Sequence, residues 1–313
     1  MILHHYELSP FAEKVRLAFG HKSIAWSSVE VPIWPPRPDT VPLTAGYRRV
    51  PVLQIGADVY CDTLRILAEI ERRVPEPTLY PGGQRALVTA LGFWADRTLL
   101  LPAVTIATSI MGDSLPEAFI RDRIALIGRD FRRAASLRAL PVERQRAAVQ
   151  MRLLADMLAD GRAFLLGEAL SAADLSAFHV LWFVRQNGGA EAEALLPFGP
   201  LRAWMERVAA CGHGHKTDMD PAEALEIARS SEPLPVAGVA GDDPSGLPAG
   251  TLVDLRADGV TDPVRGVLVG ADATEIVIRH ETERAGTVHV HFPRFGYGVV
   301  AAGGDPNSHG EAR

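Results

Sequence analysis

The spacing of apolar and polar positions at the start of the chain predicts a strand, a helix and a second strand. Residues 1–6, which begin with three apolar residues, predict a short buried strand. Ser9 and Pro10 follow it, and a helical pattern continues to about His21 before a strand-like run at 25–31. Serine is a favourable helix N-cap and proline suits the first helical turn. Because two strands joined through one helix form a right-handed crossover, we expect these strands to be parallel.

The next segment predicts a hairpin and a second helix after a loop rich in proline. That loop spans 32–42, and two short apolar runs at 50–55 and 58–61 flank a Gly56-Ala57 turn. From residue 62 to about residue 74 the apolar positions keep helical spacing. The N-terminal part is therefore predicted to run strand, helix, strand, loop, strand, strand, helix.

Helical periodicity dominates the middle of the chain. The predicted helices span 84–111, 115–137, 142–158, 172–184 and 198–210. The fourth begins with Ser171-Ala172-Ala173-Asp174, which has the spacing of a capping box. We expect no strand within this part of the chain.

The composition changes again toward the end of the chain. Pro, Gly, Ser and Asp dominate 231–248, which predicts a linker, and short alternating runs between Gly250 and Val300 predict a small antiparallel barrel of about five strands. The tail is expected to be disordered. The predicted domains are 1–80, 81–230, the linker 231–248, the barrel 249–302 and the tail 303–313.

Composition and charge narrow the functional classes. The 313 residues are 47% apolar and 22% charged, which is typical of globular domains, and the net charge of −6 offers no surplus of cations for nucleic acid or an anionic membrane. The sequence contains two cysteines, Cys61 and Cys211, so no disulfide framework is expected. The start of the chain lacks a signal-peptide pattern and no uninterrupted apolar run reaches about 18 residues, so the expected location is the cytoplasm.

Three motifs in order resemble the glutathione S-transferase superfamily. SPFAEKVRL at 9–17 is similar to the active-site segment of the tau and omega classes, VPVL at 50–53 to the family's cis-proline segment, and CDTLRILAEIE at 61–71 stands where the family has Glu-Ser. The resemblance covers about residues 1–230. It implies an α/β plus all-α fold, with a thioredoxin-like N-terminal domain and a helical glutathione-transferase C-terminal domain, to which the small antiparallel β-barrel is an addition. It also implies glutathione as co-substrate, no metal and a homodimer.

Ser9 stands at the start of a predicted helix, where unpaired backbone N–H groups and the helix dipole favour an anion. A free thiol has a pKa of about 8.5, and lowering it by one to two units is worth about 1.4 to 2.7 kcal/mol, within reach of one hydroxyl and a helix end. The resemblance therefore implies that Ser9 is the catalytic residue that stabilises the glutathione thiolate. Two alternatives stay open, because Ser9 also suits a plain helix cap and Tyr6 is a competing hydroxyl.

The resemblance assigns further glutathione contacts to the hairpin and the helix after it. Val50 would pair its backbone with the cysteinyl part of glutathione, Val50-Pro51 being a cis peptide, and Asp62 and Thr63 would bind the γ-glutamyl end. Asp62 is one methylene shorter than the family's usual glutamate, which shortens its reach to the ammonium. Both residues also suit a helix cap.

Neighbouring side chains would complete the site. Arg48 and Arg49 lie where the family often has a lysine that meets the glycine carboxylate, although two arginines in a loop also fit a solvated surface. The expected pocket for an apolar electrophile contains Phe11, Trp34, Trp94 and Met111. The helical spacing of Trp94 also fits a core position.

Two groups of histidines contain zinc-ligand types. His289 and His291 alternate along a predicted strand, and Cys211, His213 and His215 lie close in the sequence. Neither group has a further ligand at a recognised spacing, so we expect no metal site.

The leading hypothesis is a glutathione-dependent transferase that acts on a small hydrophobic electrophile. The alternative is a non-catalytic scaffold of the same fold that recognises a protein partner through its C-terminal barrel. Disulfide reduction is weakened as a third hypothesis, because a serine at position 9 cannot form a mixed disulfide with the substrate.

Overall fold

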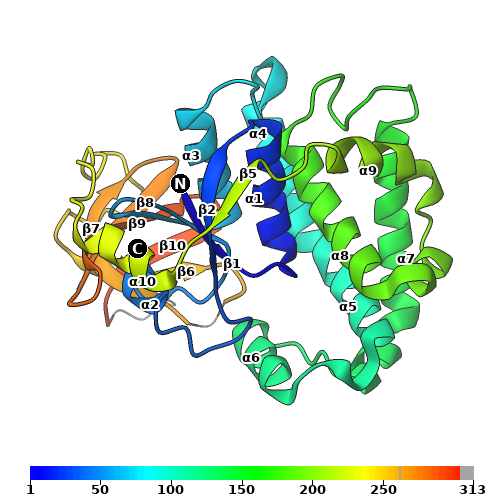
Figure 1. The fold of residues 1–313 in the computed structure, drawn as a ribbon, viewed down its shortest axis with the longest axis horizontal. Helices are drawn as coiled ribbons and strands as arrows, with labels where there is room; N and C mark the ends of the chain where they lie inside the picture. The colour runs from blue at the N-terminus through cyan, green and yellow to red at the C-terminus, as the bar shows by residue number, and fades with distance from the viewer. Residues whose placement is uncertain (261, 304–313) are drawn as a thin grey trace, which may run out of the picture. The chain divides into compact units, whose positions relative to one another are not determined.

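The computed structural model describes residues 1–260 and 262–303, which form two compact units (Figure 1). The first, called here the sheet unit, contains residues 1–5, 27–66 and the described residues from Asp218 on. The second, called the helical unit, contains residues 6–26 and 67–217. Residues 304–313, most of the tail predicted to be disordered, lie outside the described residues.

The N-terminal elements confirm the predicted order. Strands β1 and β2 pair in parallel, β3 pairs antiparallel with β1, and β4 completes a hairpin with β3. Parallel pairing follows because the connection from β1 to β2 passes through a helix. The elements are β1 (Ile2–His5), α1 (Pro10–His21), β2 (Ala25–Glu30), α2 (Val41–Thr44), β3 (Val52–Ile55), β4 (Asp58–Cys61) and α3 (Thr63–Arg73).

The C-terminal strands join this sheet, and the predicted closed barrel is wrong. Among the described residues the strands form one ten-stranded sheet in the order β10-β6-β7-β8-β9-β4-β3-β1-β2-β5. Strand β9 pairs in parallel with β4, with Asp58 opposite His289 and Tyr60 opposite His291. A closed barrel would require the outer edge of β9 to bond to another C-terminal strand. That edge is bonded to β4 instead. The elements from residue 215 on are β5 (His215–Asp218), α10 (Pro221–Arg229), β6 (Leu252–Ala257), β7 (Val264–Ala271), β8 (Glu275–Thr282), β9 (Gly286–Pro293) and β10 (Tyr297–Ala301).

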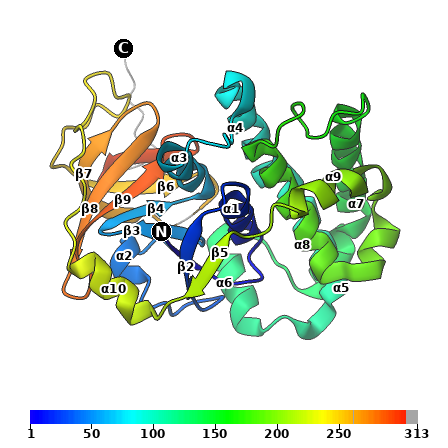
Figure 2. The same ribbon diagram turned by 45° about the horizontal axis from the view of Figure 1, so that its top comes forward.

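One hydrophobic core spans the N-terminal and C-terminal strands of the sheet unit. Val52 and Val59 belong to the same buried cluster as Ile278 and Val290, and Leu225 of α10 packs into it. Figure 2 shows β9 beside β4 and β3 in this unit. The C-terminal strands are thus packed as part of the thioredoxin-like sheet.

The segment predicted as a linker also lies against the sheet. Val239 forms a bridge with Ala271, and the Leu234 N–H donates to Oδ2 of Asp58 at 3.0 Å. One compact unit contains the described residues from Asp218 on, so it is not divided at the predicted boundaries. The segments 231–248 and 249–302 therefore stay predictions as separate parts of the chain.

The helical unit is organised around helix α8. Helices α1, α4 and α5 pack against α8, and α7 packs against α5. The Ser171–Asp174 capping box predicted at the start of α8 is present. The helices of the unit after α3 are α4 (Arg85–Trp94), the π-helical turn η2 (Ala95–Leu99), α5 (Leu100–Met111), α6 (Glu117–Ile127), α7 (Arg133–Met157), α8 (Ala172–Leu195) and α9 (Arg202–Ala209), with short 3-10 turns η1 (Pro81–Gly83), η3 (Gly112–Ser114) and η4 (Gly199–Leu201).

The break between α6 and α7 differs from the predicted one. Helix α6 ends at Ile127, where Gly128 adopts a left-handed conformation with φ 69° and its N–H bonds the Ile124 carbonyl. Helix α7 begins at Arg133 and continues through Pro141. Glycine terminates a helix in this way at low steric cost, and this local geometry, not the proline, sets the boundary.

The helical run Arg85–Met111 is long and apolar enough to cross a membrane by length and composition alone. Asp96 and Arg97 interrupt its apolar sequence. Core helices of globular domains also meet this criterion, and α5 packs on α7 and α8 in the manner of a core helix.

Candidate active site

Ser9 caps helix α1, as the sequence predicts. Its backbone is extended, its Oγ accepts a hydrogen bond from the Ala12 N–H at 3.2 Å, and the residue is only 2% exposed. A serine hydroxyl accepts through its lone pairs and donates through its one hydrogen. Ser9 can therefore cap the helix and still donate to an anion at the helix N-terminus.

Glu13 and Arg16 in the first turns of α1 are paired with each other. The Glu13 carboxylate contacts Nη2 of Arg16 at 2.7 Å and Nε2 of His213 at 3.1 Å, and Arg16 also contacts Glu7. Burial opposes ionisation of Glu13, but His213 and Arg16 outweigh it and lower the pKa of this carboxyl. The negative charge in the first helical turn is therefore compensated locally.

A buried polar cluster behind α1 was not anticipated from the sequence. Nζ of Lys14 and Nε2 of His179 contact the two carboxylate oxygens of Asp96 at 2.7 and 2.8 Å. Burial lowers the pKa of His179, and it opposes ionisation of Asp96, where Lys14 and His179 prevail and lower the pKa. The cluster ties α1 to α8 through the π-helical turn η2, and the Phe11 ring lies 4.9 Å from the His179 ring.

Tyr6, the alternative hydroxyl, has a partner in the helical unit. Its Oη accepts a hydrogen bond from Nη2 of Arg123 at 3.3 Å. Since the phenol keeps its own hydrogen in this contact, the geometry is compatible with either hydroxyl at the thiol.

In the sheet unit the predicted cis peptide is present at Val50-Pro51, just before β3. Asp62 has φ 70°, and its Oδ1 accepts a hydrogen bond from the Leu64 N–H at 3.0 Å, while Thr63 is the first residue of α3. The helix-cap role left open for Asp62 is therefore present, and its ligand contact stays a prediction.

The remaining predicted glutathione contacts are held by C-terminal residues. Nη2 of Arg49 and Oδ2 of Asp62 each lie 3.0 Å from the hydroxyl of Tyr297 on β10. Arg48 forms an ion pair with Asp262 at 2.6 Å. No local pattern predicts these contacts, because the partners lie more than two hundred residues further along the chain.

Comparison with known proteins decides the family. The "Glutathione S-transferase, N-terminal domain" family matches residues 3–78, and the "Glutathione S-transferase, C-terminal domain" family matches residues 142–207. A GST-like protein of known structure from Pseudomonas syringae is 37% identical, with a TM-score of 0.79, over 96% of this chain and 98% of that chain. The chain belongs to the glutathione S-transferase superfamily. Comparison with the curated proteins gives no match.

Other solved structures cover less of the chain. A glutathione S-transferase from Rhodospirillum rubrum F11 is 24% identical over 67% of this chain with a TM-score of 0.51, and FzlA from C. crescentus is 23% identical over 72% with the same score. These two support the fold alone. The Pseudomonas syringae protein extends the match over nearly the whole chain, so its likeness includes C-terminal strands. The tau or omega class and the serine-type site stay predictions.

The four residues predicted to line an electrophile pocket are all half-buried. Trp94 is the last residue of α4 and Met111 the last of α5, both in the helical unit with Phe11. Trp34 belongs to the sheet unit. Because Trp94 is half-buried, it is not a fully buried core residue. The pocket itself stays a prediction.

The two cysteines of the chain are poorly suited to thiol chemistry. Cys61 is fully buried on β4, and burial together with Asp62 raises the pKa of its thiol well above the usual range. Burial also raises the pKa of the half-buried Cys211. Because the thiolate is the reactive form, neither residue favours the disulfide-reduction hypothesis.

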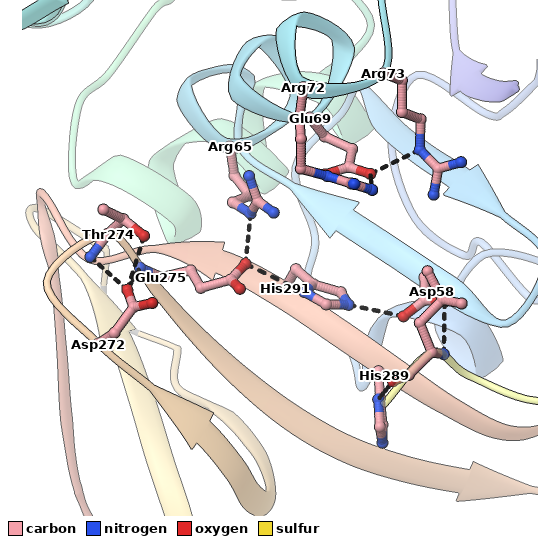
Figure 3. Close-up of polar contacts among 11 residues, drawn as sticks. Asp58, Arg65, Glu69, Arg72, Arg73, Asp272, Thr274, Glu275, His289 and His291 are labelled. Carbon is pink, nitrogen blue, oxygen red and sulfur yellow. Dashed lines mark hydrogen bonds and ion pairs between the residues drawn. The ribbon is translucent and has the colours of Figure 1, made fainter. Parts of the chain in front are cut away.

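The two histidines on β9 make their polar contacts within the sheet unit (Figure 3). Nε2 of His291 lies 2.9 Å from Oδ1 of Asp58, its Nδ1 lies 3.3 Å from Oε2 of Glu275, and Arg65 contacts the same oxygen of Glu275 at 2.7 Å. Burial opposes the imidazolium of His291, but the two carboxylates prevail and raise its pKa. Nδ1 of His289 instead donates to the Leu234 carbonyl.

The other histidine group is likewise dispersed. His213 contacts Glu13 and its carbonyl accepts from Nε1 of Trp26, whereas His215 is exposed on β5. Within residues 1–260 and 262–303 no group of three or more His, Cys, Asp or Glu side chains is arranged to hold a metal ion. The absence of a metal stays a prediction.

Proposed function

We propose that this chain is a glutathione-dependent transferase that activates the glutathione thiol as a thiolate. The thiolate would attack a small, largely apolar electrophile and form a carbon–sulfur bond as the leaving group departs with the bonding electrons. Membership of the superfamily supports this proposal. The observation that carries it is a buried serine capping the N-terminus of α1 with a hydroxyl hydrogen available to an anion.

In this proposal Ser9 is the catalytic residue but not the nucleophile. Its O–H donates to the thiolate sulfur, and the helix N-terminus adds a positive field. Arg16 and His213 pair with the Glu13 carboxylate, so its negative charge opposes an anion at the N-terminus of α1 less strongly.

The glutathione backbone would be bound by the sheet unit. Val50 would pair with the cysteinyl part, and Asp62 and Thr63 at the start of α3 would bind the γ-glutamyl end. Arg48 is the better candidate for the glycine carboxylate, because its side chain is partly exposed whereas Arg49 lies among buried tyrosines. In the helical unit, Phe11, Trp94 and Met111 would contact the electrophile, and we extend the proposal to a cytoplasmic homodimer.

Replacing Ser9 by alanine is expected to lower kcat/KM for glutathione conjugation by about 10- to 100-fold, because one hydrogen bond to a charged group is worth about 1.5 to 3 kcal/mol. Ser9→Thr, which keeps a hydroxyl and a helix cap, is expected to retain most activity. The measurement is the initial rate with a panel of small aromatic and alkyl electrophiles.

Ser230→Ala is the matched control, since Ser230 is an exposed serine whose Oγ bonds a carbonyl within α10. Equal rates for the wild type and Ser9→Ala would contradict the role of Ser9. Glutathione binding without conjugation of any electrophile would contradict the transferase activity and favour the scaffold alternative.

A further inference from the structure

The C-terminal strands contribute one side chain directly to the segment proposed to bind glutathione. Tyr297 begins β10, far outside residues 3–78 and 142–207 that match the two transferase families. Its hydroxyl bridges Arg49, before β3, and Asp62, before α3. All three residues belong to the sheet unit.

The chemistry of the groups fixes the direction of both hydrogen bonds. A guanidinium only donates and a carboxylate only accepts, so Nη2 of Arg49 donates to Oη of Tyr297 and the phenol hydrogen points to Oδ2 of Asp62. The Tyr47 hydroxyl, 3.4 Å from that of Tyr297, lies at the edge of the same network. Tyr297 thus connects the Arg49 guanidinium to the Asp62 carboxylate through two consecutive hydrogen bonds.

The surrounding packing holds this hydroxyl in place. Tyr297 is only 7% exposed, and its ring lies 5.7 Å from that of Phe292 and 5.9 Å from the Arg49 guanidinium carbon. Burial raises the pKa of Tyr297 well above its usual range, so the hydroxyl keeps its hydrogen throughout the physiological range.

Asp62 is held at both oxygens. Its Oδ1 accepts from the Leu64 N–H and its Oδ2 from Tyr297, each at 3.0 Å, and its backbone has a positive φ. Each carboxylate oxygen has a second lone pair that can accept from an ammonium. Because the Asp62 carboxylate is already held in place, it loses little side-chain entropy when it binds a ligand. This smaller entropy loss favours binding despite the shorter reach of the side chain.

We propose that Tyr297 is a positioning residue that fixes the Asp62 carboxylate for the ammonium of the γ-glutamyl group of glutathione. This inference rests on the proposed function, since it names how the same site recognises its ligand. Through Tyr297, the C-terminal strands then contribute directly to the proposed glutathione site. The preferred ligands are γ-glutamyl peptides with a free α-ammonium.

Calorimetric binding of two ligands to the full chain tests this inference. One ligand is glutathione, and the other is glutaryl-cysteinylglycine, which lacks only the ammonium. We expect the wild type to prefer glutathione. We expect Tyr297→Phe to weaken glutathione binding by about five- to tenfold while changing binding of the glutaryl analogue by less than about twofold.

Tyr60→Phe is the matched control, because Tyr60 is a buried tyrosine of β4 whose ring stacks 4.5 Å from that of His291. Its glutathione affinity and ligand preference should match the wild type. The unfolding midpoint of each variant is recorded, so that a loss of folded protein is distinguished from a loss of preference.

A double-mutant cycle isolates the coupling to Asp62. Asp62→Asn is expected to remove most of the preference for glutathione, and adding Tyr297→Phe to it should produce no further change. An equal effect of Tyr297→Phe on both ligands, no effect on either, or additive effects in the cycle would overturn the inference while leaving the proposed function intact. Absence of glutathione binding by the wild type would instead overturn the proposed function and the inference with it.

Discussion

Replacing Asp174 by alanine is expected to lower the free energy of unfolding by about 4 kcal/mol, because four buried donors lose their acceptor at once and each orphaned donor costs about 1 to 3 kcal/mol. Oδ1 accepts from the Leu165 N–H and from Nε1 of Trp204, and Oδ2 accepts from the N–H and the hydroxyl of Ser171, all within 2.9 Å. Asp174 and Ser171 are fully buried at the start of α8. The carboxylate therefore joins the central helix to the segment before it and to α9.

Urea denaturation followed by tryptophan fluorescence measures this loss. Ser171→Ala removes only part of the cap and is expected to cost about 1 kcal/mol. Asp160→Asn, a change at an exposed carboxylate paired with Arg162, should stay within about 0.5 kcal/mol of the wild type. A loss below about 1 kcal/mol for Asp174→Ala would show that the capping box does not organise the helical unit.

Replacing His291 by phenylalanine is expected to cost about 3 kcal/mol near pH 6, because it removes a buried cation from between two carboxylates. Part of the charge stays compensated, since Glu275 keeps Arg65 and Asp58 keeps the Leu234 N–H. The loss should appear in the sheet unit, where His291 links β9 to β4 and β8. His289→Gln on the same strand is the matched control and is expected to cost less than about 1 kcal/mol.

The same substitution should change how stability depends on pH. The pKa of His291 is raised in the folded protein, so its contribution is fully present below the unfolded value of about 6.5 and is lost as pH rises through the folded value. The slope approaches about 1.4 kcal/mol per pH unit between those two values. Burial lowers the pKa of His4 to about 4 and also lowers that of His179, which gives the opposite slope at lower pH.

The difference between wild-type and His291→Phe unfolding free energies, measured from pH 5 to 9, isolates this contribution from those of the other histidines. That difference should shrink as pH rises above about 6.5. A difference that stays constant across this range would show that folding does not shift the pKa of His291.

Much of the fold follows from local sequence. Ser9-Pro10, the Gly56-Ala57 turn and the Ser171–Asp174 box each act within a few residues, and the structure has a helix, a hairpin and a capped helix there. Alternation between residues 250 and 300 likewise gave the strands correctly, because it reports which side chains face a core. It does not report which strand edge bonds to which, so the pairing of β9 with β4 could not be predicted and a closed barrel was expected instead.

The site was predictable only in part, for the same physical reason. Positions such as Val50-Pro51 and Asp62 were assigned through sequence resemblance, and the structure places them at the start of β3 and of α3. The hydrogen-bond partners of residues in and near the site were not predicted. The bond between Asp62 and Tyr297 spans 235 positions, and the bond between Lys14 and Asp96 spans 82. Contacts of that range depend on tertiary packing, which no local pattern specifies. The helix α10 and strand β5 were also missed, being short segments next to the domain boundary.

The most direct test of the account is the ultraviolet thiolate absorbance of glutathione bound to the protein, followed as a function of pH in the wild type and in Ser9→Ala. In the wild type we expect the thiol of bound glutathione to have a pKa about one to two units below its free value of about 8.5, and in Ser9→Ala we expect this pKa to return toward the free value. Bound glutathione with an unshifted thiol in both proteins would contradict thiolate activation at the N-terminus of α1.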